Sequence, residues 1–171
     1  MSSHLIKSKT VVELMQFQLL YLARLINNIP DGRLYEKQLE GYNSAGWILG
    51  HLYVETEDVV AQLDKQERFG IVEEEWRKWF KNTTGRITNL RDLPNKKELW
   101  TTLQWRYEQL GQAYLNLEEA KRQSAHPSIL LKEVLTTFDA WFAHHLTTHL
   151  GIHCGNLVVW KKLVGIPVNG F

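Results

Sequence analysis

Four of the chain's seven histidines lie within ten residues, inside the segment Phe138–Leu163. Three of them, His145, His149 and His153, follow one another at i, i+4 and i+8. Each step of four residues rotates only about 40° around an α-helix, so these imidazole rings share one face. The same geometry places a mostly apolar set on that face: Phe138, Phe142, Asn156, Trp160 and Leu163. The residues expected to the sides or opposite are Leu146, Thr147, Thr148, Lys161 and Lys162.

A helix that turns imidazoles toward a core loses apolar packing and must provide partners for the ring nitrogens. Metal ligation is the most economical explanation of three such rings, whereas a single buried histidine is usually only hydrogen-bonded. Two ligand pairs fit the spacing: His145 with His149, or His149 with His153. Either pair needs a third ligand from another part of the chain.

Length and composition predict one soluble domain that spans residues 1–171, with 44% hydrophobic and 23% charged residues. The net charge of +1 gives no electrostatic basis for binding nucleic acid or an anionic membrane. The single cysteine, Cys154, excludes an intrachain disulfide and fits a reducing compartment. No segment approaches the roughly 18 apolar residues of a membrane span. We therefore expect a cytoplasmic protein with neither a nucleic-acid nor a membrane partner.

Apolar periodicity predicts four long helices and no strand. Their expected bounds are Ser8 or Thr10 to Asn28, Asn43 or Ser44 to about Lys65, Asn95 to the break at His126–Pro127, and about Glu133 to Leu163. The second and third helices are joined by a long connection, Gln66–Pro94, which contains a short amphipathic helix at Glu73–Lys81. The pattern is typical of an all-α protein, an antiparallel four-helix bundle with a long second connection.

The second helix supplies a candidate third ligand. Trp47, His51, Glu55 and Asp58 share one face of it, because His51 follows Trp47 by four residues and is itself followed by Glu55 at i+4 and Asp58 at i+7. His51 is the other helical histidine that can face the cluster on the last helix. Three imidazoles on two facing helices can hold a divalent ion and leave a coordination position open for water or substrate.

Three short motifs resemble those of the DinB/YfiT-like superfamily. Residues 47–52, WILGHL, are similar to its W-x-x-x-H-L signature. Residues 149–157, HLGIHCGNL, resemble its H-x-x-x-H-x-G-Q-[IL] segment, with Asn156 in place of the usual Gln. Residues 163–167, LVGIP, resemble the L-x-G-I-P that commonly ends it. The three motifs occur in order, and the resemblance covers nearly the whole chain.

The resemblance implies a metal-binding four-helix bundle that often forms homodimers, with His51, His149 and His153 as the ligands. The metal is divalent, and zinc, nickel, iron and manganese all remain open. Branches of the superfamily include thiol-dependent transferases and isomerases, and some members have been proposed as metal-dependent hydrolases. We therefore expect a metal-dependent transferase or hydrolase of a small molecule, which uses water or a low-molecular-weight thiol. The alternative is a non-catalytic bundle, stabilised by its metal, that serves binding or assembly.

Five further residues are candidates for the surroundings of the metal or the pocket: His145, Glu55, Asp58, Trp47 and Asn156. We expect His145 to line the same cavity without binding the metal. Glu55 or Asp58 is placed to orient a ligand ring or to act as a base. Trp47 and Phe142 are expected as pocket walls, and Cys154 as a small packing residue.

Overall fold

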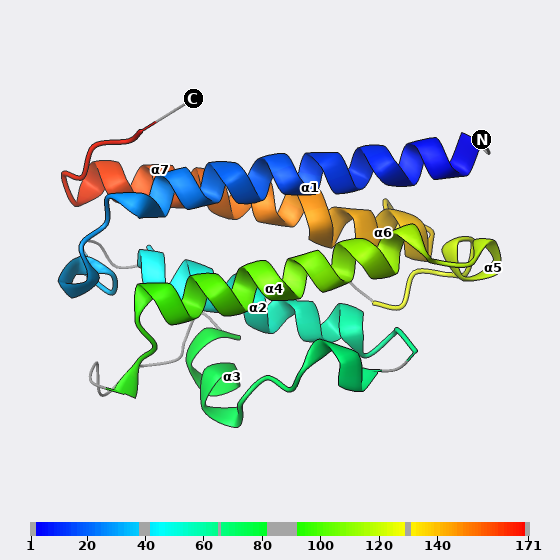
Figure 1. Ribbon diagram of the computed structural model, residues 1–171, viewed down its shortest axis with the longest axis horizontal. Coiled ribbons are helices and arrows are strands. Elements are labelled where there is room, and N and C mark those ends of the chain that lie inside the picture. The colour runs from blue at the N-terminus through cyan, green and yellow to red at the C-terminus, as the bar shows by residue number, and fades with distance from the viewer. Residues whose placement is uncertain (1–2, 38–41, 65, 82–91, 129–130, 170–171) are drawn as a thin grey trace.

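The computed structural model describes residues 3–37, 42–64, 66–81, 92–128 and 131–169, with side chains from Ser8 onward. Its helices, labelled in Figure 1, are α1 Ser3–Asn27, α2 Ala45–Val60, α3 Glu74–Phe80, α4 Lys96–Leu115, α5 Glu119–Arg122, α6 Phe138–His144 and α7 Leu150–Leu163. Short 3₁₀ turns occupy Asp31–Arg33 and Gln66–Phe69, and a π-helical turn, His145–His149, joins α6 to α7. Within the described ranges there is no strand, and no helix is long and apolar enough to cross a membrane. The predicted all-α fold is confirmed.

The long helices form a four-membered bundle in which α1 and α2 each pack against both α4 and α7. Lys96, at the start of α4, donates to the carbonyl of Ile29 just after α1, so these two helices are antiparallel. Lys161, near the end of α7, donates to the carbonyl of Leu25 near the end of α1, so these two run parallel. Figure 1 shows that α2 and α4 also run parallel, because the long second connection returns the chain to the end where α2 began.

Side-chain caps form at two of the predicted helix starts, but both helices end earlier than predicted. Ser44 accepts from the backbone N–H of Trp47 at 3.3 Å, and Asn95 accepts from that of Glu98 at 3.0 Å. Helix α2 ends at Val60 rather than Lys65, and α4 ends at Leu115 rather than near residue 125. A short connection after α4 leads into the one-turn helix α5.

The last helix departs most from the prediction, because the π-helical turn widens it at His145–His149. A π turn closes i→i+5 bonds, so it delays the rotation of every later side chain. Leu146 and Lys161, expected to point away from the core, are therefore fully buried. Asn156 and Leu163, expected to face the core, are exposed. The assumption of one regular helix was wrong.

Candidate metal centre

Helix α2 presents His51 through a close approach to α3. The glycine that precedes it, Gly50, lies directly against the ring of Phe80, and a Cβ there would meet the ring at 2.5 Å. This proximity brings the Phe80 carbonyl to 2.8 Å from Nδ1 of His51, which donates to it. Because Nδ1 carries the proton, Nε2 keeps its lone pair free to act as a ligand.

Helix α3 is fixed on α2 by two ion pairs and an aromatic contact. Arg77 binds both carboxylate oxygens of Glu57, at 2.8 and 2.6 Å, in the bidentate arrangement that gives strong, directional pairs. Lys81 binds Asp58 at 3.1 Å, and Trp76 packs edge-on against Tyr53. The carbonyl that orients His51 is therefore held by a well-anchored helix.

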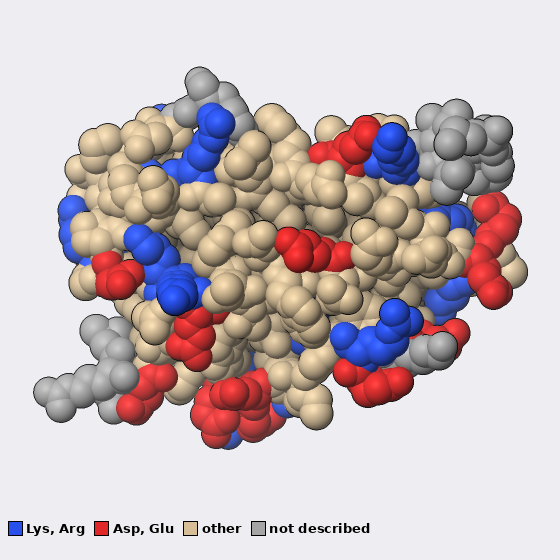
Figure 2. Space-filling view, viewed as in Figure 1, with Lys and Arg blue, Asp and Glu red and all other residues tan. Residues whose placement is uncertain are grey.

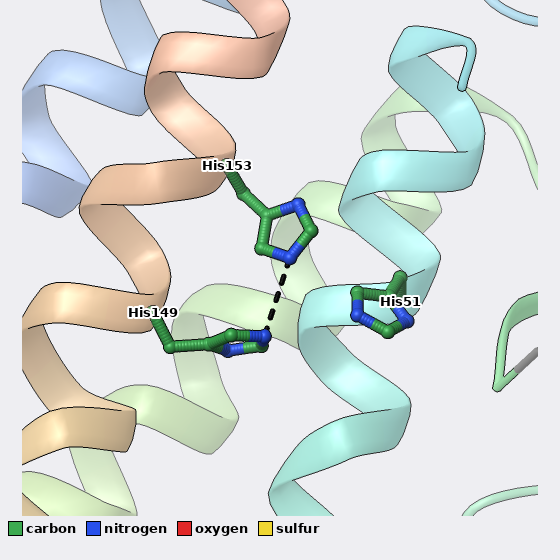
Figure 3. Close-up of side chains that lie close together, drawn as sticks. All are labelled: His51, His149 and His153. Carbon is green, nitrogen blue, oxygen red and sulfur yellow. Dashed lines mark hydrogen bonds between the residues drawn. The ribbon is translucent and has the colours of Figure 1, made fainter. Parts of the chain in front are cut away.

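His149 and His153 approach α2 from the other side of the bundle. His149 ends the π-helical turn, and His153 lies in the first turn of α7. Their Nε2 atoms are 3.2 Å apart (Figure 3). The ring of His51 lies 5.6 Å from that of His149 and 4.8 Å from that of His153, between centroids. Figure 3 shows one edge of the His51 ring directed toward the other two.

The three histidines each offer one ring nitrogen, and these nitrogens lie within 4.8 Å of one another. Burial is the main cause that lowers the pKa of all three rings, because desolvation disfavours the charged form. Neighbouring imidazoles add to the effect, and the pKa values of His149 and His153 fall to about 3. All three rings are therefore neutral at pH 7, the form that binds metals.

A cavity of about 410 Å³ lies beside the cluster and includes His149 in its wall. Trp141, His144 and His145 line one part of it, and the carboxylates of Glu55 and Asp58 line another. Its volume is within the range of small-molecule sites. The histidine cluster therefore borders a space large enough for a small ligand.

The sequence profile of the DinB superfamily matches residues 18–157, most of the 171-residue chain. The chain belongs to the DinB superfamily. The match includes the three clustered histidines, all of α2 and the first part of α7. No curated protein matches the chain.

A crystal structure of a Streptococcus pneumoniae protein from a structural-genomics programme is similar to this DinB chain, with a TM-score of 0.66. The two sequences are 16% identical, and the match covers 92% of this chain and 91% of the other. At this level of identity the likeness shows the fold alone.

The histidine cluster of this DinB protein has the dimensions of a metal site. Two nitrogens that bind one zinc ion at about 2.05 Å, in tetrahedral geometry, lie about 3.3 Å apart. The observed separation between the Nε2 atoms of His149 and His153 is 3.2 Å. His51 already has the outer hydrogen bond that metal-bound histidines usually make. Nδ1 of His149 and of His153 is buried, with no hydrogen-bond partner among the described residues. The donor set and spacing fit a divalent ion; ligation itself remains a prediction.

The predicted neighbours of the site fall in different places. The His145 ring lies 5.6 Å from that of His149 and lines the cavity, outside the three-histidine cluster. Glu55 and Asp58 line it too, but the carbonyl of Phe80, not a carboxylate, binds Nδ1 of His51.

Two expected pocket walls and one polar candidate are corrected by the structure. Trp47 is buried and stacks on His51 at 4.5 Å, so it supports the ring instead of lining the cavity. Phe142 is fully buried in the core against Tyr114. Asn156 points to solvent, because the π turn rotates α7. Cys154 is buried and unbonded to another cysteine, as expected of a packing residue, and burial raises its pKa to about 12.

Sequence reasoning missed the parts of the site that depend on backbone and on loops. The Phe80 carbonyl belongs to α3, for which the sequence predicted a short amphipathic helix but no part in the site. A signal was present in Gly50, since a glycine inside a helix costs about 1 kcal/mol relative to alanine and suggests a close approach. Trp141 and His144 also line the cavity and were not singled out.

Proposed function

We propose that this protein is a metal-dependent enzyme that transfers a thiol to a small molecule or hydrolyses a small molecule. The observation that carries the proposal is the convergence of three neutral imidazole nitrogens, from α2 and the last helix, beside a cavity of about 410 Å³. Three neutral ligands with adjacent space are typical of catalytic metal sites, whereas structural sites are closed by a fourth protein ligand.

The chemistry supplied by a bound divalent ion is a lower pKa for a thiol or water beside it. His51, His149 and His153 would hold the ion, and their neutrality leaves its +2 charge to favour an anionic partner. Other residues of the chain orient the metal ligands and enclose the substrate. The Phe80 carbonyl and the Trp47 ring fix His51, and the cavity wall holds the substrate next to His149.

Replacing His149 with Ala tests the proposal. We expect the variant to lose bound metal and turnover and to keep its helical fold, because burial along four long helices outweighs one ring. Metal content is measured by elemental analysis, turnover by thiol conjugation to model electrophiles and hydrolysis of model esters, and fold by circular dichroism. His144→Ala is the matched control, since His144 lines the cavity outside the cluster and the variant should retain metal.

A metal-free His149→Ala protein with undiminished turnover would refute the proposal. Chelation separates it from the alternative of a non-catalytic, metal-stabilised bundle. If the metal is catalytic, removing it stops turnover and leaves the fold in place. Cooperative unfolding on chelation would instead indicate a structural metal and a role in binding or assembly.

A further inference from the structure

The two carboxylates in the cavity have different partners. Asp58 is paired with Lys81 at 3.1 Å. Glu55 is only about one-fifth exposed, and its carboxylate lies 4.0 Å from Nδ1 of His51. That nitrogen already donates to the carbonyl of Phe80. Among the residues that the structure describes, no donor lies within hydrogen-bond distance of the Glu55 carboxylate.

The oxygens of Glu55 are not among the fully buried polar atoms without a partner, so this carboxylate reaches the cavity it lines and can accept a hydrogen bond from a molecule bound there. Lys81 attracts Glu55 over a longer distance but gives its hydrogen bond to Asp58. Trp141, His144 and His145 contribute aromatic rings to the cavity wall. The indole of Trp141 carries no charge, and burial lowers the pKa of both His144 and His145, which favours their neutral forms. Carboxylates together with aromatic faces form a favourable environment for an organic cation.

We propose that Glu55 binds the ammonium group of the substrate, and that the substrate is a small aminothiol. The assignment of an aminothiol substrate rests on the proposed function and specifies the substrate class of that function. The thiol is the end that suits the histidine cluster, because three neutral ligands favour an anionic sulfur. Glu55 follows His51 by one turn of α2, about 6 Å along the helix axis. An ammonium group a few bonds from the sulfur spans that distance.

The ligand preference of the cobalt-substituted full-length protein tests this inference. Three probes of similar length differ in charge: cysteamine carries an ammonium group, 2-mercaptoethanol is neutral and 3-mercaptopropionate is anionic. The near-ultraviolet absorbance of cobalt–thiolate pairs gives each dissociation constant, corrected for the thiolate fraction at the working pH. We expect cysteamine to bind about tenfold more tightly than 2-mercaptoethanol, the effect of one charge-assisted hydrogen bond, and 3-mercaptopropionate to bind most weakly.

Glu55→Gln should reduce the cysteamine preference to about one and leave the affinity for 2-mercaptoethanol unchanged. Glu108→Gln is the matched control, because Glu108 is an exposed carboxylate on α4 that does not line this cavity. Glu55→Asp, which keeps the charge, should retain part of the preference. The visible absorbance of cobalt shows that each variant is loaded.

Two outcomes overturn the inference: equal corrected affinities for the three probes in the native sequence, or a preference that survives in Glu55→Gln. The failure of the proposed thiol chemistry looks different, since none of the probes would then produce a cobalt–thiolate band. A band with all three probes and no preference refutes only the role of Glu55.

Discussion

Replacing Gly50 with Ala should weaken metal binding without touching a ligand. The new Cβ would meet the Phe80 ring at 2.5 Å, whereas ordinary contacts begin near 3.4 Å. Phe80 is fully buried, so the ring must retreat by about 0.9 Å and carry its backbone with it. The 2.8 Å bond from His51 to the Phe80 carbonyl would then lengthen to about 3.7 Å, beyond a hydrogen bond.

Two effects of this substitution on the free energy of unfolding oppose each other. Overpacking a core position costs about 1–3 kcal/mol, and alanine in place of a helical glycine recovers about 1 kcal/mol. The net loss is therefore at most about 2 kcal/mol. Losing the outer hydrogen bond of a metal-bound histidine typically lowers metal affinity by about 10- to 100-fold. That loss of affinity corresponds to about 1.4–2.8 kcal/mol, so it should be at least comparable with the change in folding stability.

The assay is competition for zinc against a chromophoric chelator, with urea unfolding of the metal-free protein alongside. Gly155→Ala is the matched control, because Gly155 is an exposed glycine on α7 with no described atom within 4 Å of an added Cβ. It should gain about 1 kcal/mol of stability and bind zinc normally. In the Gly50→Ala background, Phe80→Leu removes the ring but keeps the carbonyl, and should restore affinity. Native zinc affinity in Gly50→Ala would refute the reasoning.

The metal-free protein should lose stability between about pH 6.5 and pH 3, because the unfolded chain protonates His149 and His153 near pH 6.5 and the folded chain only near pH 3. Urea unfolding should show a loss of about 2 kcal/mol per ring between pH 7 and pH 5, and a His149→Ala protein with the same loss as the native one would contradict this. Ser44→Ala should cost about 1 kcal/mol in the same assay, since the N–H of Trp47 loses its acceptor at the start of α2; no loss would mean that the cap is dispensable. Sedimentation should detect homodimers, because Leu14, Phe17 and Leu20 on α1 are each about half exposed. In Figure 2 uncharged groups cover much of the upper part of the view, where Figure 1 places α1. Phe17→Glu should then favour the monomer, and an unchanged dimer would place the interface elsewhere.

Spacing in the sequence predicted the long helices, though not all of their ends, and placed His145, His149 and His153 on one face; the choice of His149 with His153 came from the family resemblance. An interval of four residues between His149 and His153 keeps both on one face whether the preceding turn is regular or wide. The interval from His149 to Asn156 begins at the last residue of the π turn and continues into α7, and the direction of the core relative to α7 depends on that turn. That turn contains Thr147, whose hydroxyl donates to the carbonyl of Ala143 at 2.7 Å. A threonine hydroxyl that bonds to a carbonyl one turn earlier competes with the regular helical hydrogen bonds. Threonines make the same bond in many helices that stay regular, so Thr147 alone does not predict the π turn.

The position of α3 could not be read from periodicity either. The pattern in Glu73–Lys81 predicted the bounds of this helix to within one residue. Its apolar side indicates that the helix packs against the protein but does not indicate which element it contacts. Its partner is decided by the Arg77–Glu57 pair and by the space over Gly50, which are contacts between residues more than 15 positions apart. Local sequence carries no direct record of such contacts, so the carbonyl that orients His51 came only from the structure.

The distance along the chain between the two halves of the cluster has a consequence for folding. His51 and His149 are separated by 98 residues (149 minus 51) and come together only when α2 docks against the last helix. Contacts of such long range form late, because closing a long loop costs entropy before any docking energy is gained. During synthesis, α2 leaves the ribosome well before His149 and His153 exist. If the cluster binds metal as proposed, tight uptake would wait until nearly the whole chain is made and its last helix has docked, so metal acquisition would mark the end of folding.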